Sequence, residues 1–103
     1  MIDKEFIDNK HSYRINVADM ELFLAECEEK HMMWHHGKYP TEFNPFKMYE
    51  GENIKYIEPV MNIDDRNYVY VRCFNDILYF SYQWDWTMTP YKDYIPIRST
   101  NND

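Results

Sequence analysis

The strongest constraint on the fold of this chain is a two-residue turn, Asn75-Asp76, between two runs rich in β-branched and aromatic residues. Two-residue hairpin loops require positive φ, which Asn and Asp tolerate. The runs therefore predict antiparallel strands at Tyr68–Phe74 and Ile77–Trp86. The turn also sets the register of the pair. The residues expected opposite each other are Cys73 and Leu78, Val71 and Phe80, and Val69 and Tyr82.

Alternation along these strands gives the hairpin two different faces. The six paired residues form an apolar face that needs a covering layer. The other face carries rings with polar tips, a guanidinium and an amide, which are groups that anchor protein partners or stack nucleobases. A face covered by a long loop is the alternative interpretation. The candidate binding residues on this face are Tyr68, Tyr70, Arg72, Tyr79 and Gln83.

A helix supplies the expected covering layer. Asn16 is a suitable N-cap, and apolar residues recur after it at helical spacing, which predicts a helix from Val17 to about Lys30. These apolar residues are Met20, Phe23, Leu24 and Cys27. Further strands are expected at Ser12–Ile15, Ile54–Met61 and Tyr91–Ile97. The predicted fold is α+β, with one helix packed on a four- to five-stranded antiparallel β-meander.

The length of 103 residues predicts one domain, 1–103, with charged or polar flexible ends at 1–10 and 99–103. No apolar run approaches the roughly 20 residues that cross a bilayer, and no signal segment is recognisable. We therefore expect a cytoplasmic protein without membrane contact, in which Cys27 and Cys73 stay reduced. The aromatic surplus and the sheet edges also make a homodimer plausible.

Metal-dependent catalysis is one function class to consider, because Cys27, His31 and His35 are spaced at i, i+4 and i+8. On a continuous helix these residues would form one zinc-binding stripe. Against this, Cys27 shares the apolar stripe of the predicted helix, and no second ligand pair is present. Two isolated glycines cannot build a phosphate loop or a dinucleotide fingerprint. We expect no metal, no cofactor and no catalytic residue.

A formal net charge of −7 disfavours direct nucleic-acid binding, since such proteins neutralise phosphates with clustered Lys and Arg. It favours basic partners, including the basic grooves of other proteins.

The segment after the predicted helix carries Trp34-x-x-Gly37 and then Pro40-Thr41-Glu42-Phe43. This pattern resembles small uncharacterised proteins of phages and prophages of low-GC Gram-positive bacteria, in which a helix leads to a short strand, Trp-x-x-Gly and Pro-Thr-Glu-aromatic. The resemblance covers roughly residues 17–46. The chain departs from it at Lys30-His31, where those proteins often have Gly before the short strand.

The resemblance implies a phage accessory protein, and small acidic proteins of that kind commonly act by binding. The leading hypothesis is a non-enzymatic anti-defence or host-takeover protein that blocks a host defence protein, such as a nuclease effector, through an acidic, aromatic surface. Further candidate contact residues are Trp34, His35, His36 and Glu42.

The alternative hypothesis is a sponge that sequesters a nucleotide signal in a pocket or dimer seam. Tyr70, Tyr79 or Trp34 would stack the base, and Arg72 or Arg66 would bind phosphate.

Overall fold

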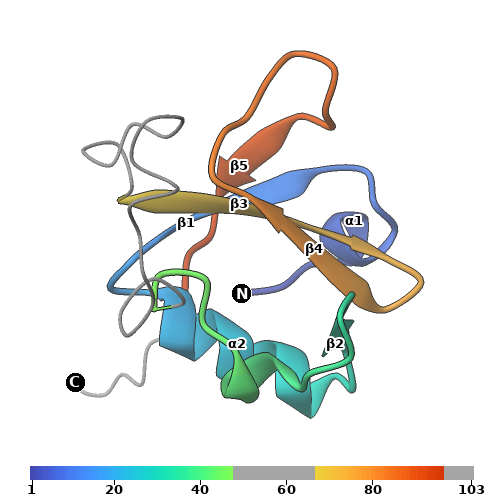
Figure 1. Ribbon diagram of the computed structural model, residues 1–103. Helices are drawn as coiled ribbons and strands as arrows, with labels where there is room; N and C mark the ends of the chain where they lie inside the picture. The colour runs from blue at the N-terminus through green and yellow to red at the C-terminus, as the bar shows by residue number, and fades with distance from the viewer. Residues whose placement is uncertain (48–66, 97–103) are drawn as a thin grey trace, which may run out of the picture.

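The computed structural model describes residues 1–47 and 67–96, which form a five-stranded sheet with one main helix against one of its faces (Figure 1). The elements are α1 (Lys4–Ile7), β1 (Ser12–Asn16), α2 (Met20–Glu29), β2 (Met33–Trp34), the short 3-10 helix η1 (Pro40–Glu42), β3 (Tyr68–Phe74), β4 (Ile77–Ser81) and β5 (Tyr91–Asp93). The predicted α+β class is confirmed. The strand predicted at Ile54–Met61 lies outside the described residues.

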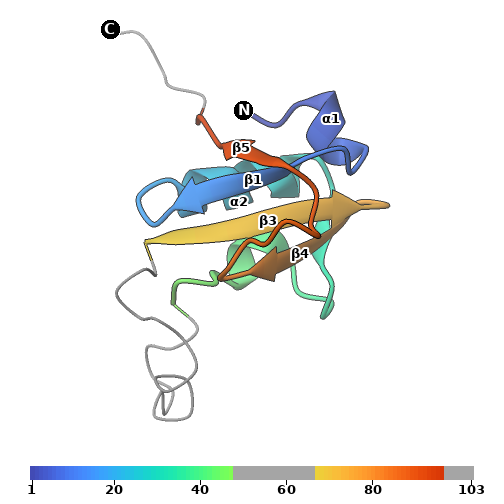
Figure 2. The ribbon, with the colours of Figure 1, turned by 90° about the horizontal axis from the view of Figure 1, so that it is seen from above.

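The sheet is mixed, so the predicted purely antiparallel meander is wrong. The strand order is β2-β4-β3-β1-β5. β3 pairs antiparallel with both β1 and β4, whereas the two outer pairs, β1 with β5 and β2 with β4, are parallel. The reason for the first parallel pair is a crossover: the chain leaves β4 and crosses the sheet to its other edge (Figure 2). β5 then enters beside β1 in the same direction.

The central hairpin follows the predicted turn and register. Asn75 and Asp76 have φ values of 53° and 64°, as a two-residue turn requires. Cys73 pairs with Leu78 and Val71 with Phe80. β4 ends at Ser81, before the expected pair of Val69 and Tyr82. The Ser81 hydroxyl accepts from Gln83 N and donates to Gln83 O, and this local turn replaces the ladder.

Helix α2 is shorter than the predicted helix at its start. The Asn16 side chain accepts a hydrogen bond from Asp19 N at 2.9 Å, which closes a turn before the first helical residue instead of capping the helix directly. At the other end, His31 N donates to Glu28 O and Met32 N donates to Cys27 O, both at 3.1 Å. This pair of bonds is a Schellman motif, and it places His31 in the left-handed region with φ 63°.

The core lies between α2 and the inner face of the sheet. Helix residues Phe23, Leu24 and Cys27 are buried there. Of the predicted apolar face four strand residues are buried and two, Phe80 and Tyr82, are partly buried; the buried four are Val69, Val71, Cys73 and Leu78. A cluster of rings extends this core towards the N-terminus, and it consists of Phe6, Tyr13, Phe23 and Tyr94.

No helix in residues 1–47 and 67–96 is long and apolar enough to cross a membrane.

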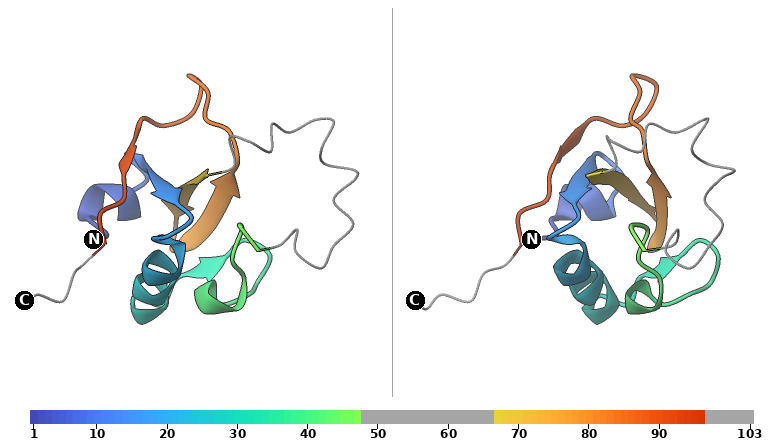
Figure 3. Two further views of the ribbon diagram at one scale, coloured as in Figure 1. Left: turned by 90° about the vertical axis from the view of Figure 1, so that its left-hand side faces the viewer. Right: turned by 60° about the vertical axis from the view of Figure 1, so that its left-hand side comes forward.

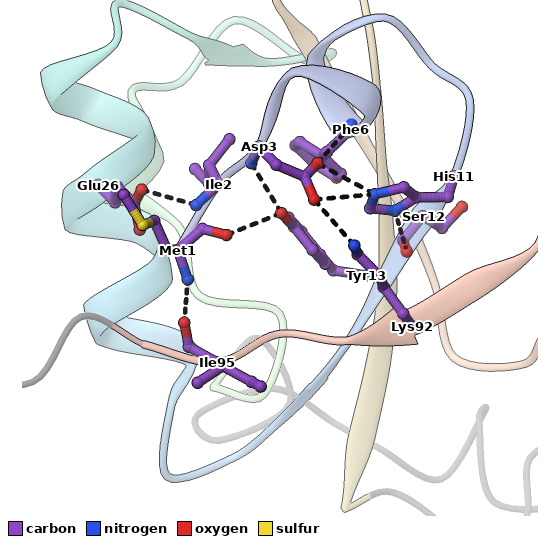
Figure 4. A network of polar contacts seen from close by, with 10 residues as sticks. All are labelled: Met1, Ile2, Asp3, Phe6, His11, Ser12, Tyr13, Glu26, Lys92 and Ile95. Carbon is purple, nitrogen blue, oxygen red and sulfur yellow. Dashed lines mark hydrogen bonds and ion pairs between the residues drawn. The ribbon is translucent and has the colours of Figure 1, made fainter.

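The N-terminal segment, predicted as a flexible end, is folded against this core. Asp3 caps α1 by accepting a hydrogen bond from Phe6 N, and the Phe6 side chain is fully buried. Backbone groups are also held, since Ile2 N donates to Glu26 at 2.7 Å and Asp3 N donates to the Tyr13 hydroxyl at 2.9 Å (Figure 4). The charged composition of the segment suggested a flexible end, but here polar side chains cap α1 and hydrogen-bond the backbone of the segment.

A candidate binding surface on the outer sheet face

The sheet face opposite α2, called the outer face from here on, carries no helix among the described residues (Figure 3). The connection from β4 to β5 crosses it instead. Strand alternation and register bring large polar-tipped side chains of four strands to this face. They are Arg14 from β1, Tyr68, Tyr70 and Arg72 from β3, Tyr79 from β4, and Tyr91 and Asp93 from β5.

Arg14 is the paired cation of the outer face. Its Nε lies 2.7 Å and its Nη2 3.2 Å from the two carboxylate oxygens of Asp93. Its guanidinium carbon also lies 4.5 Å from the ring centre of Tyr68 and 5.4 Å from that of Tyr91. The hydrogen bond to Asp93 raises the pKa of Arg14 further above its ordinary value. Arg14 therefore holds β1, β3 and β5 together at this face.

Arg72 is the second cation, and its surroundings differ. It pairs with Tyr79 across the β3–β4 ladder, and its guanidinium carbon lies 4.5 Å from the ring centre. The His35 ring stacks on Tyr79 with centroids 5.4 Å apart and an interplanar angle of 6°. Within residues 1–47 and 67–96 no carboxylate pairs with Arg72. Arg72 is thus held by an aromatic ring while its N–H donors lack an acidic partner in the described chain.

The connection from β4 to β5 adds two tryptophans beside the outer face. Trp84 packs edge-on against Tyr91 with centroids 5.3 Å apart, and its indole N–H donates to Thr89 O at 2.8 Å. A tight turn follows, in which Met88 N donates to Asp85 O and the Asp85 carboxylate accepts from Thr87 N. Trp86 sits on this turn with 84% of its surface exposed. The hydrogen-bonded connection therefore exposes the indole of Trp86 beside the outer face.

A hollow of about 370 Å³ opens on the outer face. Two small side chains stand among large ones here, since Ser81 lies opposite Tyr70 and Ser12 lies at the edge of the hollow. The Ser12 hydroxyl bonds Thr89 at 2.6 Å, which ties the crossing connection to β1. The hollow is lined by Ser12, Tyr70, Arg72, Tyr79, Phe80, Ser81 and Met88.

Some of the predicted site residues lie on the outer face, and others pack in the core or hold the segment after α2. Tyr68, Tyr70, Arg72 and Tyr79 share the outer face as expected, and Gln83 is exposed just beyond β4. His35 joins them through its stacking on Tyr79.

Trp34 is only 1% exposed and cannot be a contact residue in this structure. Its indole N–H donates to Phe43 O at 3.0 Å, and its ring meets Phe43 edge-on. Glu42 caps η1 by accepting from Tyr39 N. His36 is exposed beside Phe43, and burial, His35 and Lys38 lower its pKa. Apart from His36, these residues hold the segment after α2 on the core.

The zinc stripe Cys27, His31 and His35 is not formed. The positive φ of His31 ends α2, so the helical spacing does not continue to His35. Cys27 is fully buried, and burial raises the pKa of its thiol. In the described residues, no group of three His, Cys, Asp or Glu side chains is placed to hold a metal ion, and both cysteines are free thiols.

Helix α2 carries four glutamates, Glu21, Glu26, Glu28 and Glu29. Three of the glutamates of α2 have partners: Glu21 pairs with Lys47, Glu28 accepts from Thr41, and Glu26 accepts from Ile2 N and the Tyr94 hydroxyl. These glutamates lie on the helix side of the sheet, whereas the rings named above lie on the outer face, where Asp93 is the acidic side chain paired with Arg14.

Three outer-face residues were not identified from the sequence: Arg14, Tyr91 and Asp93. The sequence does mark Trp84 and Trp86 as a second candidate surface, with core or dimer contact as the alternative interpretation. Alternation within the predicted strand Ser12–Ile15 separates Arg14 from Tyr13 and Ile15, but which face of the sheet Arg14 occupies follows only from the pairing with β3.

Comparisons with protein-family models, with curated proteins and with solved structures found no match to the chain.

Proposed function

We propose that this chain is a non-enzymatic binding protein whose outer sheet face docks on a host protein and blocks it, with a defence protein such as a nuclease effector as the target class. One observation carries the proposal: exposed aromatic side chains gather on the outer face and its crossing connection. They are Tyr68, Trp84, Trp86 and Tyr91. Contiguous exposed apolar surface of this kind marks interaction sites.

The residue types on this face are those that carry most binding energy in protein interfaces. Trp, Tyr and Arg are enriched among interface hot spots. Here Trp86 is displayed on a hydrogen-bonded turn, and Tyr68 and Tyr91 are held against Arg14. The rings of Tyr68 and Tyr91, which already pack against Arg14, lose little conformational entropy when they bind, so more of their contact energy appears as affinity.

The charge of the chain has a separate role in this proposal. The acidic side chains of α2 lie across the sheet from the aromatic residues, so a partner on the outer face does not contact them directly. A net charge of −7 still attracts a basic partner at long range and speeds association at low salt. The target class itself comes from the resemblance of residues 17–46 to phage accessory proteins.

A capture experiment tests the proposal. The full chain is immobilised and exposed to a host lysate at low salt, and the same is done with Trp86→Ser and Leu22→Ser. Leu22 is a matched control, because it is an exposed apolar residue on α2. We expect a captured protein to be lost with Trp86→Ser, with affinity at least about 30-fold weaker, and kept with Leu22→Ser. The purified captured protein should lose its activity on nucleic acid when the chain is added.

Equal capture by both variants would refute the assignment of the contact to the outer face. Capture of no protein at low salt would refute the blocking function itself.

Sequestration of a nucleotide signal is the second candidate function, and the hollow beside Arg72 is the observation that favours it. Its volume of about 370 Å³ falls within the range of ligand pockets. A sponge should deplete a nucleotide from solution at near-stoichiometric concentrations of protein.

A further inference from the structure

The hollow on the outer face has three kinds of lining: aromatic rings, a guanidinium and hydroxyl groups. Tyr79 and Arg72 form one cross-strand pair, and Ser81 and Tyr70 form the next pair along the ladder. Because Ser81 is small, the space between these four side chains is not filled by the sheet itself. Met88 reaches the hollow from the crossing connection. The site is therefore built from β3, β4 and a connection that is hydrogen-bonded to β1 through Thr89.

Arg72 determines the charge that this hollow accepts. The chain has 18 acidic and 11 basic residues, yet no acidic side chain of the described residues pairs with Arg72. On the same face Arg14 is neutralised by Asp93. A guanidinium presents N–H donors in a planar fork that fits the oxygens of a phosphate or carboxylate. An anionic group is thus the complement that Arg72 lacks within residues 1–47 and 67–96.

The rings determine the shape that the hollow accepts. Tyr70 and Tyr79 both line it. Arg72 and the stacked ring of His35 already pack against the ring of Tyr79, so Tyr79 forms a fixed wall and Tyr70 is the ring that can stack a ligand. Aromatic faces bind other flat π-systems by stacking, at about 1–3 kcal/mol for each base. A volume of about 370 Å³ has room for a single flat ring system with one charged group.

We infer that this hollow is a binding site for a flat aromatic ring that carries one phosphate or carboxylate, with a mononucleotide as the best-fitting class. Arg72 binds the anionic group, and Tyr79 and Tyr70 contact the ring. The inference deepens the second proposed function by naming the ligand chemistry, and it concerns the purified chain alone.

Titration calorimetry with the full chain tests the inference. The probes are adenosine monophosphate, uridine monophosphate, phenyl phosphate and benzoate, with inorganic phosphate and adenosine as compounds that carry only one of the two groups. We expect the compounds with both ring and anion to bind at least about 10-fold more tightly than inorganic phosphate or adenosine. A preference for phosphate over benzoate would assign a phosphate source, and the reverse would assign a carboxylate source.

Three variants assign the binding to these residues. Arg72→Gln and Tyr79→Leu should each weaken binding of phenyl phosphate at least about 10-fold. Arg72→Lys keeps the charge but not the planar fork, and should give an intermediate loss. Lys10→Gln is the control: it removes an exposed cation that does not line the hollow, and should change affinity less than about 2-fold. Upfield shifts of the phenyl protons in NMR spectra of the complex would report stacking on Tyr70.

The inference is overturned if none of the ring-bearing anions binds, if inorganic phosphate binds as tightly as phenyl phosphate, or if Lys10→Gln weakens binding as much as Arg72→Gln. Binding of a mononucleotide that depends on Arg72, without depletion of nucleotide signals at stoichiometric protein, would keep the site and refute the sponge function.

Discussion

The substitution His31→Gly should stabilise the protein, because His31 occupies a backbone conformation that favours glycine. His31 follows the last turn of α2 with φ 63°, at the position where Schellman motifs usually have Gly. An L-residue in the left-handed region costs about 1–2 kcal/mol, a strain that glycine avoids. The side chain is exposed, and it makes no hydrogen bond or ion pair in the described part of the chain.

Two opposing effects set the size of the gain. Relief of the left-handed strain contributes about 1–2 kcal/mol. The greater freedom of glycine in the unfolded chain removes about 0.4–1 kcal/mol of this. The net expectation is a free energy of unfolding higher by about 0.5–1 kcal/mol, which raises the melting temperature of a domain of this size by roughly 3–6 °C. Urea unfolding followed by circular dichroism at 222 nm measures the change.

Lys30→Gly is the matched control, because Lys30 precedes His31 and has φ −94°. Glycine relieves no strain there and should lower the free energy of unfolding by about 0.5–1 kcal/mol. Destabilisation by both substitutions would show that His31 is helical. It would also restore the stripe Cys27, His31 and His35 as a candidate metal site.

Three further outcomes follow from the N-terminal network and the buried thiols. Tyr13→Phe should lower the free energy of unfolding by about 2 kcal/mol in urea titrations, since the Tyr13 hydroxyl accepts from Asp3 N and donates to Met1 O. Although burial opposes it, hydrogen bonds from Phe6 N and Lys92 lower the pKa of Asp3 from 3.8 to about 2. The ionised carboxylate of Asp3 therefore stabilises the fold above about pH 4, and this stabilisation is lost as the pH falls toward 2. In Asp3→Asn the free energy of unfolding should change less with pH over this range. The difference should be at most about 1 kcal/mol, because the carboxylate is partly exposed. Burial raises the pKa of Cys27 and of Cys73, so a thiol reagent should label neither residue rapidly in the native state and both in denaturing urea.

Local rules explain which parts of the fold could be predicted. The Asn75-Asp76 turn needs only positive φ at two adjacent residues, and it determines the register of β3 and β4 without any distant contact. The helix stripe likewise depends on spacing within ten residues. The position of β5 depends instead on how the connection crosses the sheet, which no local pattern encodes. For the same reason sequence reasoning predicted the outer-face residues of β3 and β4, but not Arg14 of β1 and Tyr91 of β5, which join them on this face.

The pattern Trp34-x-x-Gly37 and Pro40-Thr41-Glu42-Phe43, from which the phage-type hypothesis was drawn, bears on how this chain folds. Its residues are structural in this fold: Trp34 is buried, Gly37 has φ 94°, and Glu42 caps η1. In this chain the pattern therefore holds the segment after α2 on the core. The outer face uses different residues, which lie on β1, β3, β4 and β5. Under the proposed function a partner is recognised by the outer face and not by this pattern, so variants of Arg72, Trp86 and the rings beside them are the ones that identify it.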